Sequence, residues 1–152
     1  MQWLLGLALL SAVFGALAPW ERLSIATRRW ASTALMVLQA SPFVVLMWLF
    51  IADDIAYEIV RLHGGADMPI AYRISAAWGG REGPLLLWAG ILTVCAYWFG
   101  RNGATDVGPT RNLRQRLTQG FILALLAIAW LLEPFRPAVG IGRSELNPLL
   151  QT

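Results

Sequence analysis

Ser75-Ala-Ala-Trp-Gly-Gly-Arg-Glu-Gly-Pro-Leu-Leu-Leu-Trp88 brings charges, glycines and two tryptophans together at the start of an apolar run. Arg81 and Glu82 lie between two glycines, and the apolar run opens at Pro84. Proline suits the first turn of a helix, where its missing N–H costs nothing. Glu82 lies just upstream, where the positive end of the helix dipole favours an anion. The stretch therefore predicts a water-facing turn that leads into a membrane-length helix.

The composition is that of an integral membrane protein. Of the 152 residues, 57% are hydrophobic, eight are tryptophan and only 14% are charged, against about 25% charged in an ordinary soluble domain. All twelve basic residues are arginines spread along the chain, which argues against a nucleic-acid surface. A single cysteine, Cys95, excludes a disulfide or a cysteine-based metal site within the chain.

Apolar runs predict an all-α membrane fold with four transmembrane helices, at about residues 2–19, 31–51, 84–99 and 117–132. Pro42 falls within the second helix and should kink it. A polar loop at 53–83 contains Ile70 and Ile74 at helical spacing, which indicates a short helix on the membrane surface. The tail at 133–152 is rich in proline and glycine and reads as non-helical. We expect residues 1–152 to form a single membrane domain.

The arginines also predict an orientation. The loops at 21–30 and 101–116 hold seven of them, and the other side holds five. Basic residues are retained in the cytoplasm, so these two loops should face inward. Both termini and the loop at 53–83 should then face outward.

Three segments resemble the CcmF family, the cytochrome c haem lyase subunit of a maturation system. The segment Trp78-Gly-Gly-Arg-Glu-Gly-Pro-Leu-Leu-Leu-Trp88 is similar to that family's signature WG.HEGS.LLW. Ile51-Ala-Asp-Asp54 resembles the acidic end of its second membrane helix, and Leu146-Asn-Pro-Leu-Leu-Gln151 resembles the LNPLLQD segment after its fourth. The order and spacing of the three segments fit across nearly the whole chain.

The resemblance implies a function. CcmF-type proteins handle haem on the outer face of the membrane and join its vinyl groups to the two cysteines of a Cys-x-x-Cys-His motif in apocytochrome c. By resemblance the chain is the N-terminal portion of such a lyase and takes part in haem attachment, with haem binding and haem transport as associated properties. The implied cofactor is haem b, held by the complete complex rather than by this chain alone. The implied partners are the remaining lyase chain with its tryptophan-rich segment, a haem chaperone, apocytochrome c and membrane lipid. The implied location is the bacterial inner membrane, in preference to an organellar inner membrane.

The chemical candidates are few. The predicted membrane helices contain no ionisable residue deep in the apolar core, and no nucleophilic triad, phosphate loop or metal-ligand cluster is found in the sequence. We therefore predict no catalytic and no metal-ligating residue in this chain, which leaves its standing as an enzyme open. The only histidine, His63, is interpreted as solvated in preference to ligating haem iron. The acids Asp53, Asp54 and Glu58 are interpreted as a solvated helix end, with docking of a basic partner as the alternative.

Four residues are predicted to contact haem or a partner chain: Trp78, Arg81, Glu82 and Trp88. Arginine pairs bidentately with carboxylates such as the haem propionates. The alternative for Arg81 and Glu82 is a mutual ion pair that caps the third helix. The two tryptophans are either membrane-interface anchors or stacking platforms for the porphyrin.

The chain also departs from the family pattern. It lacks the tryptophan-rich segment WGxWWxWD and the membrane histidines, and it has Arg81 where the signature has histidine and Pro84 where it has serine. Arginine supplies charge but cannot ligate iron. The chain is then one piece of a split lyase, a truncated reading frame or a divergent relative. The alternative from another class is a small non-catalytic membrane scaffold or assembly protein, and a pore or transporter is disfavoured.

Overall fold

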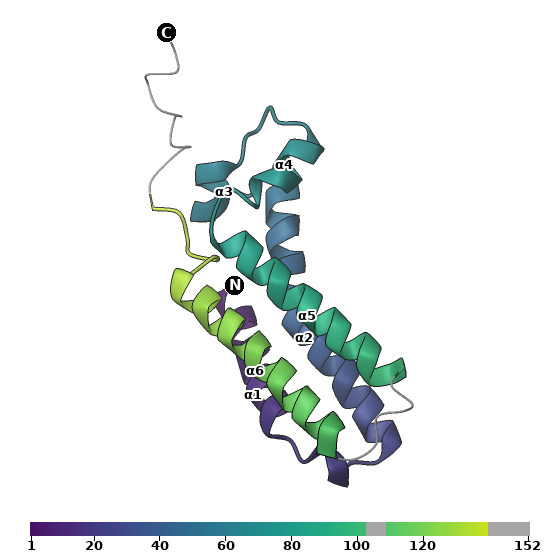
Figure 1. The fold of residues 1–152 in the computed structure, drawn as a ribbon. Helices are drawn as coiled ribbons and strands as arrows, with labels where there is room; N and C mark the ends of the chain where they lie inside the picture. The colour runs from purple at the N-terminus through teal and green to yellow at the C-terminus, as the bar shows by residue number, and fades with distance from the viewer. Residues whose placement is uncertain (103–108, 140–152) are drawn as a thin grey trace.

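The computed structural model describes residues 1–102 and 109–139, and over these ranges the chain is helical, as predicted. No strand occurs in these two ranges beyond an isolated antiparallel bridge between Tyr57 and Pro137. The elements in order are α1 (Gln2–Leu17), the 3-10 helix η1 (Trp20–Arg22), α2 (Ile25–Ala52), α3 (Glu58–His63), α4 (Ile70–Ala76), α5 (Glu82–Asn102) and α6 (Pro109–Leu132). The four long helices form a closed bundle in which α1 packs on α6 and α2, and α5 packs on α2 and α6 (Figure 1).

Three of the long helices have the length and hydropathy needed to cross a membrane: α2, α5 and α6. The first helix is apolar, but its 16 residues are fewer than the roughly 20 that span the hydrocarbon core. The structure therefore gives three candidate spans and one shorter apolar helix, and the fourth crossing stays a prediction.

The helices extend beyond their apolar cores. The second helix begins at Ile25 rather than near residue 31, because Ser24 caps it and its hydroxyl accepts a hydrogen bond of 3.1 Å from the Thr27 amide. The sixth begins at Pro109 rather than near residue 117, with proline again at the first helical position. Hydropathy locates the part of a helix that lies in lipid, whereas capping residues decide where its backbone begins.

Pro42 does not interrupt α2, and it is buried. Because proline has no amide proton, the carbonyl of Leu38 loses its helical donor. The Ser41 hydroxyl donates to that carbonyl at 2.9 Å, so the backbone group is satisfied within the helix.

The residues between α2 and α5 form a cap over one end of the bundle, which we define as residues 53–80. The cap contains two short helices, α3 and α4, where the sequence indicated one (Figure 1). Arg73 attaches the cap to the bundle, because its guanidinium donates to the carbonyls of Met68 at 3.0 Å, Ala66 at 2.6 Å and Ile51 at 3.1 Å. The last of these carbonyls belongs to the final turn of α2.

The chain after α6 returns to the cap. Glu133 has a φ of 50°, which turns the chain sharply at the end of the helix. Phe135 is buried in the core, and the Glu58 amide donates to the Arg136 carbonyl at 3.0 Å. The predicted family-like segment at 146–151 lies outside the described residues.

Small residues allow close helix contacts in the bundle. A Cβ on Gly15 of α1 would lie 2.7 Å from Oε1 of Gln119 on α6, and one on Gly6 would lie 3.2 Å from the Trp130 ring. The core between these helices is made of Leu5, Ala8, Ala12, Leu46, Leu49, Phe50, Leu86, Ala89, Ile122, Leu126, Ala129 and Phe135, among others. Gly6 and Gly15 thus pack helices within this chain.

Candidate functional site

The signature turn runs from the end of α4 to the first turn of α5. Successive amides close it, with Trp78 donating to Ser75 at 3.0 Å and Gly79 donating to Ala76 at 2.9 Å. Gly83 is in contact with the carbonyl of Ala77, so a Cβ at position 83 would overlap that oxygen. A glycine is required here because the start of α5 lies directly against the end of α4.

Glu82 is the first residue of α5 and Pro84 lies in its first turn. The carboxylate of Glu82 folds back over Gly80, since a side chain at position 80 would collide with its Oε2. A negative charge at the amino end of a helix is favoured by the helix dipole. The predicted placement of an anion at this end agrees with the geometry.

Arg81 is exposed, and no hydrogen bond or ion pair joins it to Glu82 within this fully described turn. The mutual capping pair that the sequence allowed is not formed. The guanidinium therefore stands beside the start of α5 as an exposed cation.

The two tryptophans of the signature lie at different positions along the bundle. Trp78 lies in the turn with 46% of its surface exposed, and Trp88 lies on α5 with 59% exposed. From Glu82 to Trp88 the helix rises about 9 Å at ~1.5 Å per residue. Trp88 is therefore placed further along the membrane-length helix, while Trp78 stays with Arg81 and Glu82 in the turn.

His63, which the sequence analysis treated as solvated, lies against this turn. A Cβ on Gly79 would lie 2.7 Å from Cδ2 of the His63 ring, and one on Gly80 would lie 3.7 Å from its Cε1. The imidazole and the Glu82 carboxylate thus flank Gly80. The signal in the sequence was the pair Gly79-Gly80, whose lack of side chains leaves room for a ring.

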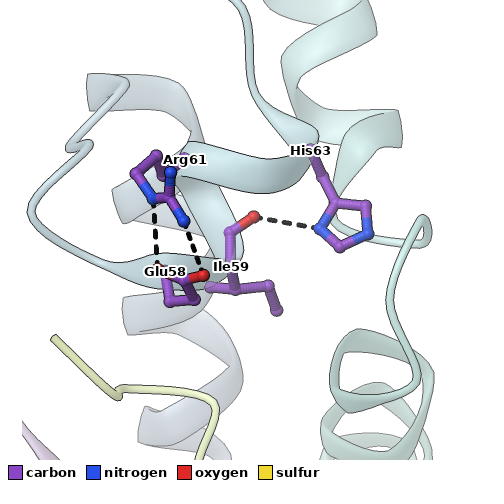
Figure 2. Close-up of polar contacts among 4 residues, drawn as sticks. All are labelled: Glu58, Ile59, Arg61 and His63. Carbon is purple, nitrogen blue, oxygen red and sulfur yellow. Dashed lines mark hydrogen bonds and ion pairs between the residues drawn. The ribbon is translucent and has the colours of Figure 1, made fainter. Parts of the chain in front are cut away.

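The tautomer of His63 follows from its hydrogen bond. Nδ1 lies 3.1 Å from the Ile59 carbonyl oxygen, and Figure 2 marks this contact with a dashed line. A carbonyl only accepts, so Nδ1 is the donor in this contact. Nε2 is bonded to Cδ2 and Cε1, the ring atoms nearest Gly79 and Gly80, so this edge of the ring faces the turn.

The acidic residues between the end of α2 and the start of α3 have local structural roles. Asp53 ends α2 in the left-handed conformation, with a φ of 55°, and Asp54 Oδ1 accepts from the Ala56 amide at 3.2 Å. Glu58 forms a bidentate pair with Arg61 at 2.7 and 3.1 Å (Figure 2). The hydrogen bond from Arg61 holds the pKa of the Glu58 carboxyl below its ordinary value. These contacts support the interpretation as a helix end.

The site therefore offers one exposed guanidinium and two exposed indoles near one end of a membrane bundle. A guanidinium can pair with a carboxylate, and indole rings can stack on a flat ligand. Among the described residues there is no group of three or more His, Cys, Asp or Glu that could hold a bare metal ion. Fold and site together define a multi-pass, all-helical membrane protein with a capped polar end.

Comparison with known proteins gives the family. The cytochrome c-type biogenesis protein CcmF of Escherichia coli is 29% identical over 153 residues, which cover 97% of this chain and 24% of that protein. CcmF of Pseudomonas aeruginosa is 31% identical over 152 residues, covering 95% and 23%, and CycK of Rhizobium meliloti is 33% identical over 129 residues, covering 80% and 18%. No family model and no solved structure matches the chain.

The chain belongs to the CcmF-type family of cytochrome c-type biogenesis proteins, as the three sequence segments predicted. It spans about a quarter of the length of the curated relatives that cover it most fully. It thus corresponds to a portion of such a protein, in agreement with the predicted N-terminal portion.

Proposed function

We propose that this chain is the N-terminal portion, or a separate subunit, of a CcmF-type haem lyase and takes part in attaching haem to apocytochrome c. Its relatives are named as cytochrome c-type biogenesis proteins, which supports a role in cytochrome c maturation. Its contribution is to frame the haem-handling part and to present the signature turn to haem or to a partner.

One observation carries the proposal: the exposed, unpaired Arg81 lies in the same turn as Trp78 and Glu82, against which the His63 ring is packed. An arginine without an internal partner is available to a carboxylate from outside. The haem propionates and acidic side chains of a partner both supply such carboxylates.

The proposed topology has four crossings, with both termini and the cap on the outer side of a bacterial inner membrane. The cap, the start of α1 and the end of α6 lie at the same end of the bundle (Figure 1). The connection between α1 and α2 lies at the opposite end with the first turns of α2. These segments carry Arg22, Arg28 and Arg29, which the positive-inside rule assigns to the cytoplasm.

The proposed cofactor is haem b, bound by the complete complex, with Trp78, Arg81, Glu82 and Trp88 contributing contacts from this chain. The proposed partners are the lyase chain with the tryptophan-rich segment, a haem chaperone and apocytochrome c. Haem supplies the vinyl groups to which the apocytochrome thiols are joined. The role of this chain is to orient the propionates and to cover the porphyrin.

Substitution of Arg81 tests the proposal in cells whose cytochrome c maturation depends on this chain. Arg81→Lys keeps the charge but loses the planar fork, so we expect normal protein levels with reduced covalent haem in a reporter cytochrome. Losing one member of a buried charged contact costs on the order of 2–5 kcal/mol. Arg22→Lys, an exposed arginine at the other end of the bundle, is the matched control. Full maturation with both Arg81→Lys and Arg81→Gln would remove the turn from the proposed site.

A scaffold without direct haem contact is the second candidate, and the outer surface of α5 favours it. Trp88, Ile91, Cys95 and Trp98 are exposed at spacings of three and four residues and so share one face. Such a face suits packing against another membrane helix. If Ile91→Arg abolishes maturation while the Arg81 variants do not, the scaffold function is favoured.

A further inference from the structure

An apolar groove runs between α1 and α2 on the side of the bundle away from the cap. It is lined by residues 7–14 of α1 and 31–38 of α2, among them Leu10, Phe14, Ala34 and Leu38. Leu10 and Phe14 are 67% and 56% exposed, so these side chains border the groove without filling it. The one hydroxyl in the lining, that of Ser11, donates to the Ala8 carbonyl at 2.7 Å and offers no free donor.

The groove has the length of one membrane leaflet. The exposed tryptophans of α2, Trp30 and Trp48, are 77% and 66% exposed. They are separated by about 27 Å at ~1.5 Å per residue, close to the ~30 Å of the hydrocarbon core. Between Ala31 and Leu38 the helix rises about 11 Å, within the ~15 Å half-thickness of that core. The groove therefore faces the acyl chains of the leaflet on the Trp30 side.

Two apolar occupants suit this groove, a hydrocarbon chain or the side chains of a partner helix. Its volume is about 330 Å³, or about 630 Å³ with its open side included. The charge at one end of the groove favours a lipid, because a lipid joins a hydrocarbon chain to a polar headgroup.

Arg28 supplies a charge at the level of the lipid headgroups. The successive spacings from Arg28 to Ala31, Leu35 and Leu38 are three, four and three residues, so the four share one face of the helix. Arg28 therefore lies on the groove side of α2, just beyond Trp30. Its Nε is buried and has no hydrogen-bond partner in the structure. Side chains on a helix lean toward its amino end, which directs Arg28 away from the apolar groove and into the headgroup layer. The Arg28 side chain is partly exposed and has no ion pair among the described residues, so its guanidinium suits a phosphate oxygen.

We propose that the groove between α1 and α2 binds one anionic phospholipid, with an acyl chain between residues 7–14 and 31–38 and its phosphate on Arg28. Arg22 and Arg29 lie exposed at the same end and add positive charge around the headgroup. This site is distinct from the cap and does not depend on the role of Arg81.

Native mass spectrometry of the delipidated full chain, titrated with phosphatidylglycerol or phosphatidylcholine, tests the site. We expect one phosphatidylglycerol to bind with higher affinity than phosphatidylcholine. Arg28→Gln should weaken phosphatidylglycerol binding about fivefold, the effect of one basic residue at a membrane surface, and should leave phosphatidylcholine unchanged. Ala34→Leu places a larger side chain in the groove and should weaken both lipids.

Two matched variants serve as controls. Arg29→Gln removes a neighbouring exposed charge, and Gly120→Leu places the same side chain on α6, where a Cβ would have no heavy atom within 4 Å. Ala34 is exposed, so Ala34→Leu tests the groove even if Arg28→Gln lowers the yield of folded protein. Equal binding of both lipids to the wild type overturns the proposal. The proposal is also overturned if Arg28→Gln and Ala34→Leu leave the lipid affinities unchanged. It is overturned as well if a second copy of the chain displaces the lipid.

Discussion

Gln39 of α2 and Gln119 of α6 are 80 positions apart in the chain, and their side chains are joined by a buried hydrogen bond of 2.8 Å. Thr93 of α5 donates to the other amide atom of Gln39 at 3.2 Å. The three membrane-length helices are therefore linked by one polar network, and Gly15 of α1 lies close to Gln119. Such a network specifies which helix faces meet, because an unpaired amide in apolar surroundings costs free energy.

Gln119→Leu should destabilise the bundle by leaving the Gln39 amide unpaired. Hydrogen bonds between membrane helices contribute about 0.6 kcal/mol on average and at most about 1.7 kcal/mol. A double-mutant cycle of Gln39→Leu and Gln119→Leu, followed by denaturant unfolding in detergent, should give a coupling energy in that range. Gln115→Leu, which changes a nearby glutamine for which the structure shows no hydrogen bond, is the control. A coupling energy near zero would mean that the network adds no specificity.

Cysteine labelling should place the cap and the opposite end of the bundle on different sides of the membrane. In a Cys95→Ala background, Ala66→Cys in the cap should react with a membrane-impermeant reagent in intact cells, and Thr110→Cys at the start of α6 should not. Both positions are exposed, so the difference reports the side of the membrane rather than burial. The opposite labelling pattern would reverse the proposed orientation.

Gly79→Ala should disturb the signature turn, because the added methyl group would lie 2.7 Å from the His63 ring. We expect reduced protection of the cap amides in hydrogen exchange. Combining it with His63→Ala should restore protection, since the smaller side chain removes the clash. If His63→Ala fails to rescue Gly79→Ala, the packing of the ring on the turn is not the cause.

The helix α3 should become less stable in acid. The pKa of Glu58 is lowered by its hydrogen bond with Arg61, so its stabilising contribution is present above the ordinary glutamate pKa and is lost as the pH falls through the lowered value. Amide protection in residues 56–61 should therefore decline as the pH falls below about 4.5. Glu58→Gln should remove this dependence, whereas Asp67→Asn in the exposed part of the cap should keep it. A pH response that survives in Glu58→Gln would assign the effect to another group.

Several features of this protein were predictable because they depend on neighbours in the chain. The apolar runs predicted the helices, and Pro84 and Glu82 marked the start of α5 within two residues. The family could also be identified without coordinates, because three short segments together match it in order and spacing. Helix ends were predicted less well, because hydropathy does not register the cap at Ser24 or the polar first turns of α6.

Composition and hydropathy were sufficient to predict the class of this protein and its long helices, and the order and spacing of three short segments were sufficient to predict its family. Which of those residues meet depended on the packed fold. In the structure, His63 packs on Gly79 and Arg81 forms no ion pair with Glu82. Gln39 forms a hydrogen bond with Gln119 across the bundle. The physical reason is that these contacts depend on how the helices are rotated and packed against one another. That arrangement is fixed by the sum of many weak side-chain contacts and not by any local pattern.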